Sequence, residues 1–259
     1  MQQINSDLIV FTDAGTEFDS DFLIEIAGAF ADETVGATAG YLLFGEKPGD
    51  VNVRSQGFYW SYELKLRTLE SHLGCLAVVA GAAFAIRRGL MRPMDPAIGE
   101  DCIVPLDVVT QGYRIVHAEN ARAFETFEQD AGITFRSRTR MTLRNWQGTW
   151  SRPGLLNPLK HPRYAFALWS HKLLRWLSPV FLLTGTASSA GLLMLNPGPA
   201  SLLASAPFTM LFSLGLLGLL NRKLPGTGMA FSFLIANTAF LLGILRAVRG
   251  RKVLSYRNV

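Results

Sequence analysis

The charges of this chain are divided between two halves. All 20 aspartates and glutamates lie at or before Asp130, together with 9 lysines and arginines, whereas the remaining residues carry 16 lysines and arginines and no acid. Such an asymmetry indicates two physical environments rather than one globule. An acid-free basic half suits an anionic membrane face or a polyphosphate. Nucleic acid is not expected as a partner, because the basic residues alternate with long apolar runs instead of forming one soluble patch.

The basic half contains three runs without charge, at 176–195, 202–220 and 229–245. Each is roughly 17–20 residues long, close to what a helix needs to cross the hydrocarbon core of a bilayer. We therefore expect residues 176–259 to form a transmembrane region with about three hydrophobic segments, in a cell (inner or plasma) membrane. The positive-inside rule places Lys172 and Arg222 in the cytoplasm, but three full crossings would put the basic C-terminal residues outside. The number and orientation of the crossings stay open at this point.

Residues 131–175 are expected to lie at the membrane surface. The segment 133–150 predicts a basic amphipathic helix, in which apolar residues such as Phe135 alternate with arginines. Such a helix can lie in the plane of the headgroups. A second interfacial element is expected at 162–175, where tyrosine, phenylalanine and tryptophan accompany basic residues.

The acidic half predicts an α/β domain over residues 1–130. Continuous runs of small and branched apolar residues are typical of strands that are buried on both faces. The expected strands are at 8–12, 35–43, 77–86, 113–118 and 121–125, and the expected helices are at 20–31, 53–72 and 100–111. Cys75 and Cys102 lack metal-ligand spacing, so we expect reduced thiols in a cytosolic domain.

Acidic residues stand at two breaks in this pattern. Asp13 directly follows the strand at 8–12, and open α/β sheets bind ligands just outside the carboxyl ends of their strands. Glu100 and Asp101 follow a loop with two prolines, from which a carboxylate can reach a substrate hydroxyl and take its proton. The simpler explanations are a turn or helix cap for Asp13, and a favourable position at a helix N-terminus for Glu100 and Asp101.

A glycine and a basic-aromatic cluster also suit an anionic ligand. Gly81 interrupts an expected strand, and a missing side chain there often marks the close approach of a ligand, although tight packing explains it equally. Arg140, Arg144 and Trp146 could neutralise a diphosphate leaving group, or could bind lipid headgroups. Together with the acids, these residues suggest chemistry on an anionic, phosphorylated substrate at a membrane surface.

The segments that carry these residues resemble those of the membrane-bound family 2 glycosyltransferases of the bacterial cell-surface polysaccharide type. The similar segments are 10–16, 81–88, 99–101, 112–115 and 144–146, with 170–176 and 237–246 in the membrane tail. The resemblance covers nearly the whole chain. It implies an α/β fold: a partial GT-A (Rossmann-like) catalytic domain over 1–130, basic amphipathic interfacial helices over 131–175, and a C-terminal α-helical transmembrane region over 176–259.

The resemblance also implies a reaction and its residues. The expected enzyme is an inverting, hexosyltransferase-like glycosyltransferase that moves a sugar from a nucleotide-diphosphate donor to a cell-surface glycan or lipid-linked acceptor. It would act at the cytoplasmic membrane face, in contact with membrane lipids, and use Mg²⁺ or Mn²⁺. Asp101 would be the base, supported by Glu100, while Asp13 would bind the metal and the donor diphosphate beside Gly81. The residues expected near the leaving group are Arg140, Arg144 and Trp146.

Three departures from the family pattern qualify this expectation. Gly15 stands where a second acid is expected, which would leave Asp13 to share the metal with water and phosphate oxygens. The glutamine-led arginine–tryptophan motif of processive synthases is replaced at 140–146, which argues against the synthesis of long polymers. The first β-α-β units of the family, which cradle the nucleotide base, would precede Met1, so we expect this chain alone to be poorly active.

Two other functions fit the same residues. The chain could be a truncated, non-catalytic homologue that acts as a membrane-bound binding or interaction protein. It could also be a polyprenyl-phosphate sugar transferase whose membrane spans guide the lipid. The residues do not specify the sugar, the nucleotide, the acceptor or the linkage.

Overall fold

The computed structural model describes residues 5–44, 57–126, 130–222 and 224–253. The chain forms two compact units. Unit 1 comprises Met1–Gln129 with Gln147–His171, and unit 2 comprises Asp130–Trp146 with Lys172–Val259. The segment 131–175, expected at the membrane surface, therefore contributes to both units.

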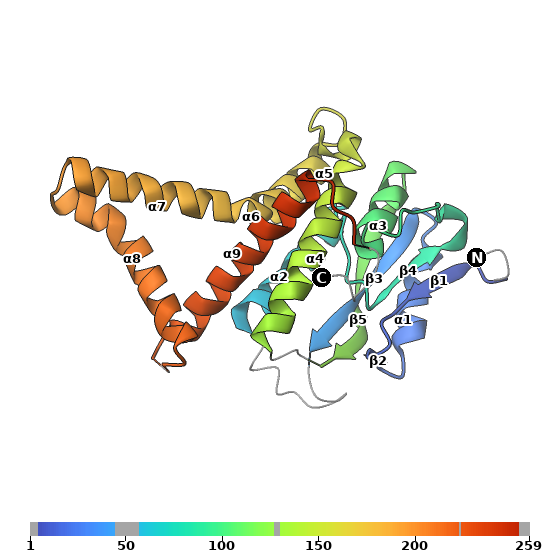
Figure 1. Ribbon diagram of the computed structural model, residues 1–259. Coiled ribbons are helices and arrows are strands. Elements are labelled where there is room, and N and C mark those ends of the chain that lie inside the picture. Colours follow the sequence, from blue (N-terminus) through green and yellow to red (C-terminus); the bar gives the residue numbers. More distant parts are fainter. Residues whose placement is uncertain (1–4, 45–56, 127–129, 223, 254–259) are drawn as a thin grey trace. The chain divides into compact units, whose positions relative to one another are not determined.

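Unit 1 is built around a five-stranded sheet with the order β1-β4-β3-β5-β2 (Figure 1). Its strands are β1 (Leu8–Phe11), β2 (Glu17–Phe18), β3 (Val35–Phe44), β4 (Phe84–Arg87) and β5 (Arg114–Glu125). Its helices are α1 (Phe22–Gly28), α2 (Gly57–His72), α3 (Glu100–Thr110) and α5 (Pro162–Ala167), together with the last turn of α4 (Ala131–Trp150).

The strand directions place several chain ends at one edge of the sheet. β3 and β5 are parallel, and β4 runs antiparallel to both β1 and β3. β1, β3 and β5 therefore end at the same edge, which we call the carboxyl edge, and β4 begins there. Phe11, the last residue of β1, pairs with Phe84, the first residue of β4. The segments that follow β1 and precede β4 thus leave the sheet side by side.

Two helices cover opposite faces of the sheet. Gly40 of β3 faces α1, since a Cβ on Gly40 would lie 2.9 Å from the ring of Phe22. Its neighbour Ala39 pairs with His117 of β5, which faces the other way and whose ring nitrogen Nδ1 meets the hydroxyl of Thr68 on α2 at 3.0 Å. The core under α1 is made largely of small side chains, which lets the helix lie close to the sheet.

The structure confirms most expected elements of the acidic half and corrects two. The strand expected at 77–86 is wrong over most of its length, because only Phe84–Arg87 pairs in the sheet. Before β4 the chain turns, with the amide of Ala83 donating to the carbonyl of Ala80 at 3.2 Å. The two strands expected at 113–118 and 121–125 are one strand, β5, which carries an irregularity opposite Gly40 and Tyr41. The expected start of the helix at 53–72 lies outside the described residues.

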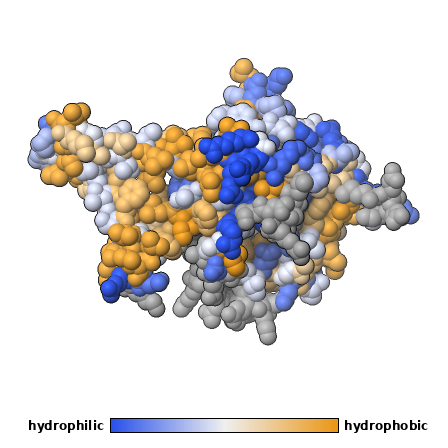
Figure 2. All heavy atoms as spheres, in the orientation of Figure 1, coloured by the Kyte–Doolittle hydropathy of each residue, from blue (hydrophilic) through white to orange (hydrophobic). Residues whose placement is uncertain are grey.

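Unit 2 is helical. It contains most of α4, the short α6 (Leu174–Trp176), α7 (Ser178–Leu195), α8 (Pro199–Leu219) and α9 (Thr227–Val248). By length and composition, α7, α8 and α9 can each cross a membrane, so the three expected hydrophobic helices are confirmed. Figure 2 shows hydrophobic side chains gathered over α8 and α9.

The helices of unit 2 approach one another at glycines. A Cβ on Gly243 of α9 would lie 2.7 Å from Thr142 of α4, and one on Gly218 of α8 would lie 2.6 Å from the carbonyl oxygen of Thr227 on α9. Small residues at such positions allow helices in an apolar environment to gain dispersion contacts. One side-chain hydrogen bond supplements this packing, from Ser178 to Asn237 at 2.6 Å.

Candidate active site

The loop after β1 crosses the carboxyl edge toward β5. It turns at Asp13, whose carbonyl accepts a hydrogen bond from the amide of Thr16 at 3.1 Å. The hydroxyl of Thr16 then donates to Oε1 of Glu125, the last residue of β5, at 3.0 Å. This contact spans 109 positions of sequence. It holds the exposed Asp13 at the edge where ligands bind in α/β sheets.

Glu125 is an acid that the sequence did not single out. Burial raises the pKa of its carboxyl group above the ordinary value, the hydroxyl of Thr16 lowers it, and the negative charge of Asp13 adds to the rise. Asp13 and Glu125 are therefore within electrostatic range of each other. The available signal was its position at the end of a predicted strand, the same signal that selected Asp13.

Gly81 lies beside the first turn of α3. A Cβ on Gly81 would sit 3.4 Å from the Cβ of Asp101 and 3.9 Å from Oε1 of Glu100. The backbone carbonyl of Asp101 also accepts the amide of Val79 at 3.3 Å. Gly81 was expected inside a strand, but it lies in the turn before β4. It has no side chain there, next to two half-buried carboxylates.

The topology gathers four of the expected site residues at the carboxyl edge. Asp13 follows Phe11 by two positions and Gly81 precedes Phe84 by three, so both flank the pair that ends the β1–β4 ladder. Through its contact with Gly81, the first turn of α3 adds Glu100 and Asp101 to the same edge. Both acids lie at the helix N-terminus, so their favourable interaction with the helix dipole holds alongside any chemical role.

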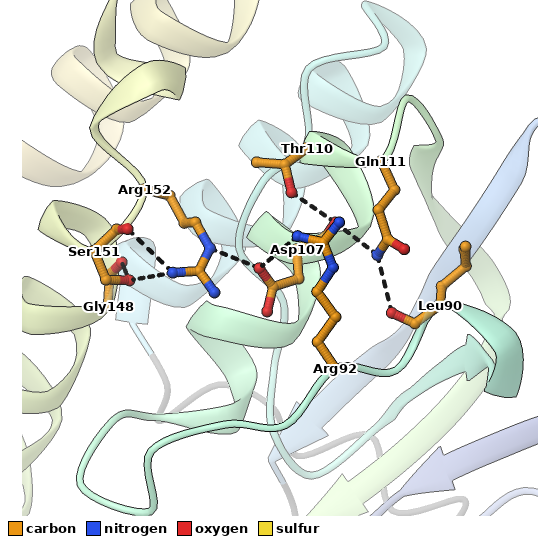
Figure 3. A network of polar contacts seen from close by, with 8 residues as sticks. All are labelled: Leu90, Arg92, Asp107, Thr110, Gln111, Gly148, Ser151 and Arg152. Atoms are coloured by element: carbon orange, nitrogen blue, oxygen red, sulfur yellow. Dashed lines mark hydrogen bonds and ion pairs between the residues drawn. The ribbon is translucent and has the colours of Figure 1, made fainter.

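A buried aspartate on α3 forms an ion pair with an arginine in the chain that follows α4 (Figure 3). Oδ1 of Asp107 lies 2.6 Å from Nε of Arg152 and 3.9 Å from the more exposed Arg92. The side chain of Asp107 is only 4% exposed, so the charge is removed from water and depends on its partners. The last turn of α4 meets the start of α3 as well, since a Cβ on Gly148 would lie 3.0 Å from Sγ of Cys102.

The aromatic and basic residues expected near the leaving group lie on the part of α4 that belongs to unit 2. Trp146 packs against a cluster that contains Leu143 and Ala247, and its ring centroid lies 6.2 Å from that of Trp176. Arg140 and Arg144 are half-buried on the same helix. Their approach to a leaving group stays a prediction.

Unit 1 also buries a polar cluster that the sequence did not predict. His171 bridges two glutamates of α2, with Nδ1 2.7 Å from Glu70 and Nε2 3.0 Å from Glu63. Arg67, between them on the helix, pairs with Glu63 at 3.2 Å. His117 lies nearby: burial, and then the charge of Arg67, lower its pKa to about 4. The seven-residue spacing of the two glutamates on α2 was visible, but nothing in the sequence connected it with His171.

The carboxylates at the carboxyl edge suit a divalent cation. Mg²⁺ prefers oxygen ligands and is commonly held by one or two carboxylates plus substrate phosphates. Asp13 and Glu125 offer such a pair, and a cation would relieve the repulsion that contributes to the raised pKa of Glu125. No group of three or more histidines, cysteines or acids is arranged to hold a metal within 5–44, 57–126, 130–222 and 224–253.

Comparisons with known proteins identify the family. The family model described as glycosyl transferase family group 2 matches residues 8–244. No curated protein sequence matches the chain. A solved mannosyltransferase from Pyrobaculum calidifontis, in complex with GDP-Man and Mn²⁺, is similar in structure with a TM-score of 0.68 and 18% sequence identity. The alignment covers 97% of this chain and 65% of that one.

These findings confirm the expected fold class. At 18% identity the structural likeness shows a shared fold, which is GT-A-like: a mixed α/β sheet followed here by three apolar helices. Because the family model extends over most of its length, the chain belongs to glycosyl transferase family group 2.

Proposed function

We propose that this chain takes part in an inverting, hexosyltransferase-like transfer of a sugar from a nucleotide-diphosphate donor to a cell-surface glycan or a lipid-linked acceptor. The observation that carries the proposal is the gathering of Asp13, Gly81, Glu100 and Asp101 at the carboxyl edge of a glycosyltransferase sheet. Acids are thereby available at the edge where ligands bind in this class of sheet.

The proposed reaction is an in-line displacement. The acceptor hydroxyl oxygen bonds to the anomeric carbon of the sugar, and the bond from that carbon to the donor diphosphate breaks. The hydroxyl proton passes to the carboxylate of Asp101, and the nucleoside diphosphate leaves with the bonding electron pair. Glu100 supports Asp101, and Gly81, which has no side chain beside these two acids, lets the donor approach the backbone.

The displacement also requires that the negative charge on the leaving diphosphate be offset. Asp13, with Glu125 beside it, would hold Mg²⁺ or Mn²⁺ against the phosphate oxygens. When bound, such a cation offsets negative charge that develops on the leaving group. Arg140, Arg144 and Trp146 are proposed to contact the same diphosphate. The mannosyltransferase to which the chain is similar was solved with GDP-Man and Mn²⁺, which supports a nucleotide sugar and a divalent metal here.

A membrane location follows from the composition of the basic half. Residues 176–259 are proposed to cross the cell membrane more than once, with residues 131–175 at its surface and the catalytic domain, 1–130, in the cytoplasm. The apolar length of α7, α8 and α9 supports this arrangement, as does the absence of acids after Asp130. Membrane lipids and a lipid-linked or glycan acceptor are then within reach of the enzyme.

The test measures nucleoside diphosphate release by the full chain, purified in detergent with Mn²⁺, from a panel of nucleotide sugars. Asp101→Asn should lower turnover by a factor on the order of 10²–10⁴ while donor binding, measured by isothermal titration, is kept. Glu33→Gln is the matched control, because Glu33 is an exposed acid just before β3, at the opposite edge of the sheet. Equal turnover of Asp101→Asn and Glu33→Gln would remove Asp101 as the base.

A second function, a membrane-bound binding protein without catalysis, is favoured by one feature. Gly15, in the position where the family resemblance expects a second acid, is exposed and a Cβ there would meet nothing within 4 Å. Restoring an acid with Gly15→Asp should therefore cost little stability. Tight, metal-dependent nucleotide-sugar binding by the unmodified chain, together with turnover, would exclude this alternative, whereas binding without turnover in both proteins would favour it.

A further inference from the structure

A groove in unit 2 lies between α4, α8 and α9. Its cavity has a volume of about 330 Å³, which is within the range of small-molecule sites. Side chains from the second half of α8 and the first half of α9 form its walls, and Phe135 of α4 closes one side. We call this cavity the α8–α9 groove.

Close helix packing creates the groove. A Cβ on Gly215 of α8 would lie 2.3 Å from Cδ1 of Leu234 and 3.8 Å from the carbonyl oxygen of Ala230, both on α9, so the two helices lie close together at this glycine. The aromatic rings of Phe212 and Phe231 line the same cavity. The groove is thus formed where two helices pack against each other, and not by a loop.

The chemistry of the groove selects a hydrocarbon chain. Among its lining residues, Thr238 has the one polar side chain, and its hydroxyl donates to the carbonyl of Leu234 on its own helix at 2.8 Å. The side-chain hydroxyl of the lining therefore has its hydrogen already committed, and the other lining side chains are apolar. The groove also lies on helices that are apolar enough to cross a membrane, where lipid chains surround the protein.

The basic residues of α4 favour a lipid with an anionic headgroup. Phe135 is adjacent in sequence to Arg136, and Arg138 follows one turn later on the same helix. Unit 2 contains 13 lysines and arginines and a single acid, Asp130. Basic residues on the helix that contributes Phe135 to an apolar groove are complementary to a lipid that carries a phosphate.

We propose that the α8–α9 groove is a binding site for one anionic membrane phospholipid, with an acyl chain in the groove and its phosphate against Arg136 and Arg138. This inference goes beyond the proposed transfer reaction, because it requires no catalysis. It also differs from the general contact of membrane helices with lipid, because one lipid with a preferred headgroup is bound at one site.

The experiment counts lipids that the full chain retains, by native mass spectrometry from mixed micelles with phosphatidylglycerol or phosphatidylcholine of equal chain length. The wild type should retain one phosphatidylglycerol in preference to phosphatidylcholine. Thr238→Phe fills the groove and should abolish this retention, whereas Ser232→Phe, an equally exposed position of α9 outside the lining, should not. Equal retention of both lipids by the wild type, or full retention by Thr238→Phe, would overturn the proposal.

The headgroup contact has its own matched pair. Arg138→Gln should weaken phosphatidylglycerol retention about tenfold, as expected for the loss of a charge-assisted hydrogen bond, while Arg249→Gln, an exposed arginine at the end of α9, should leave it unchanged. A competition on the wild type needs no folded variant: glycerol phosphate should not displace the lipid, and long-chain phosphatidylglycerol should. Displacement by glycerol phosphate alone would show that the protein binds the phosphate but not the acyl chain, and would contradict lipid binding in the α8–α9 groove.

Discussion

The two units of this protein secure their packing by different physical means. Unit 1 buries charged side chains with polar partners, such as Asp107 with Arg152, and Glu63 with Arg67 and His171. In unit 2 the hydroxyls of residues such as Thr186 and Thr238 bond to the carbonyl four positions earlier on their own helix. The helices of unit 2 meet at glycines instead.

The difference is the one expected if α7, α8 and α9, which are apolar enough to cross a membrane, lie in lipid. A buried ion pair is costly to desolvate, but removing one partner costs more because the other charge is then left alone. Any arrangement of the chain that separates such a pair is therefore higher in free energy. Helices in lipid gain little from hiding apolar surface, so contact between their backbones decides how they pack. We therefore expect the loss of a single polar side chain to destabilise unit 1 strongly and unit 2 weakly.

The largest effect is expected at the His171 bridge. His171→Ala leaves Glu70 buried without the imidazole and takes one partner from Glu63, which should lower the free energy of opening α2 by about 4 kcal/mol. Hydrogen exchange of α2 peptides in the full chain measures this locally. His72→Ala, an exposed histidine at the end of α2, is the control. Similar exchange in both variants would mean that the bridge does not hold α2.

A somewhat smaller effect is expected for the ion pair that anchors α3. Arg152→Met leaves the buried Asp107 with only the distant guanidinium of Arg92, so α3 should become easier to open by about 3 kcal/mol. Arg114→Met removes an exposed ion pair with Asp32 and should leave exchange of α3 unchanged. If α3 exchanges alike in the two variants, Asp107 is not held by Arg152.

Acidification should weaken unit 1 through His117. The pKa of this histidine is lowered in the folded state to about 4 from 6.5, so between these values the unfolded chain binds the proton and the folded chain does not. The contribution of His117 to the free energy of unfolding is therefore fully present above the unfolded pKa. It falls as the pH drops, by about 2 kcal/mol between pH 7 and pH 4.5. His117→Gln should remove this part of the pH dependence, measured by exchange of β5 peptides, and His161→Gln should keep it.

The smallest effect is expected in unit 2. Asn237→Leu removes the hydrogen bond from Ser178 and keeps the apolar packing, so it should destabilise α9 by only about 0.6 kcal/mol. Ser178→Ala removes the same bond from the other side and should have an equal effect. A loss as large as that of His171→Ala would show that polar contacts govern both units, and the contrast between them would fail.

Local signals predicted the elements that depend on neighbours in sequence. The charge-free runs predicted α7, α8 and α9, and alternating apolar and basic residues predicted α4. The strand at 77–86 was the main error, because apolar composition cannot distinguish a buried strand from a buried turn. In the structure the amide of Val79 pairs with Asp101 of α3 and not with a strand.

The site residues divide in the same way. Asp13, Glu100 and Asp101 could be selected from the sequence, since each stands where an apolar element begins or ends. Glu125 carried the same signal at the end of a predicted strand but was not selected, and Arg152 carried none; their contacts with Thr16 and Asp107 span 109 and 45 positions. The roles of all these residues in catalysis are predictions for the experiments above.

Charge and hydropathy alone predicted different surroundings for the acidic and the basic half, because these properties act on each residue wherever it is placed. The sequence also determined which acids terminate apolar elements. Only the folded chain shows that the loop at Asp13 reaches Glu125, that Gly81 lies beside Asp101, and that Arg152 pairs with Asp107. These contacts depend on strand order and register, which arise from the packing of the whole sheet and are not encoded in any single segment.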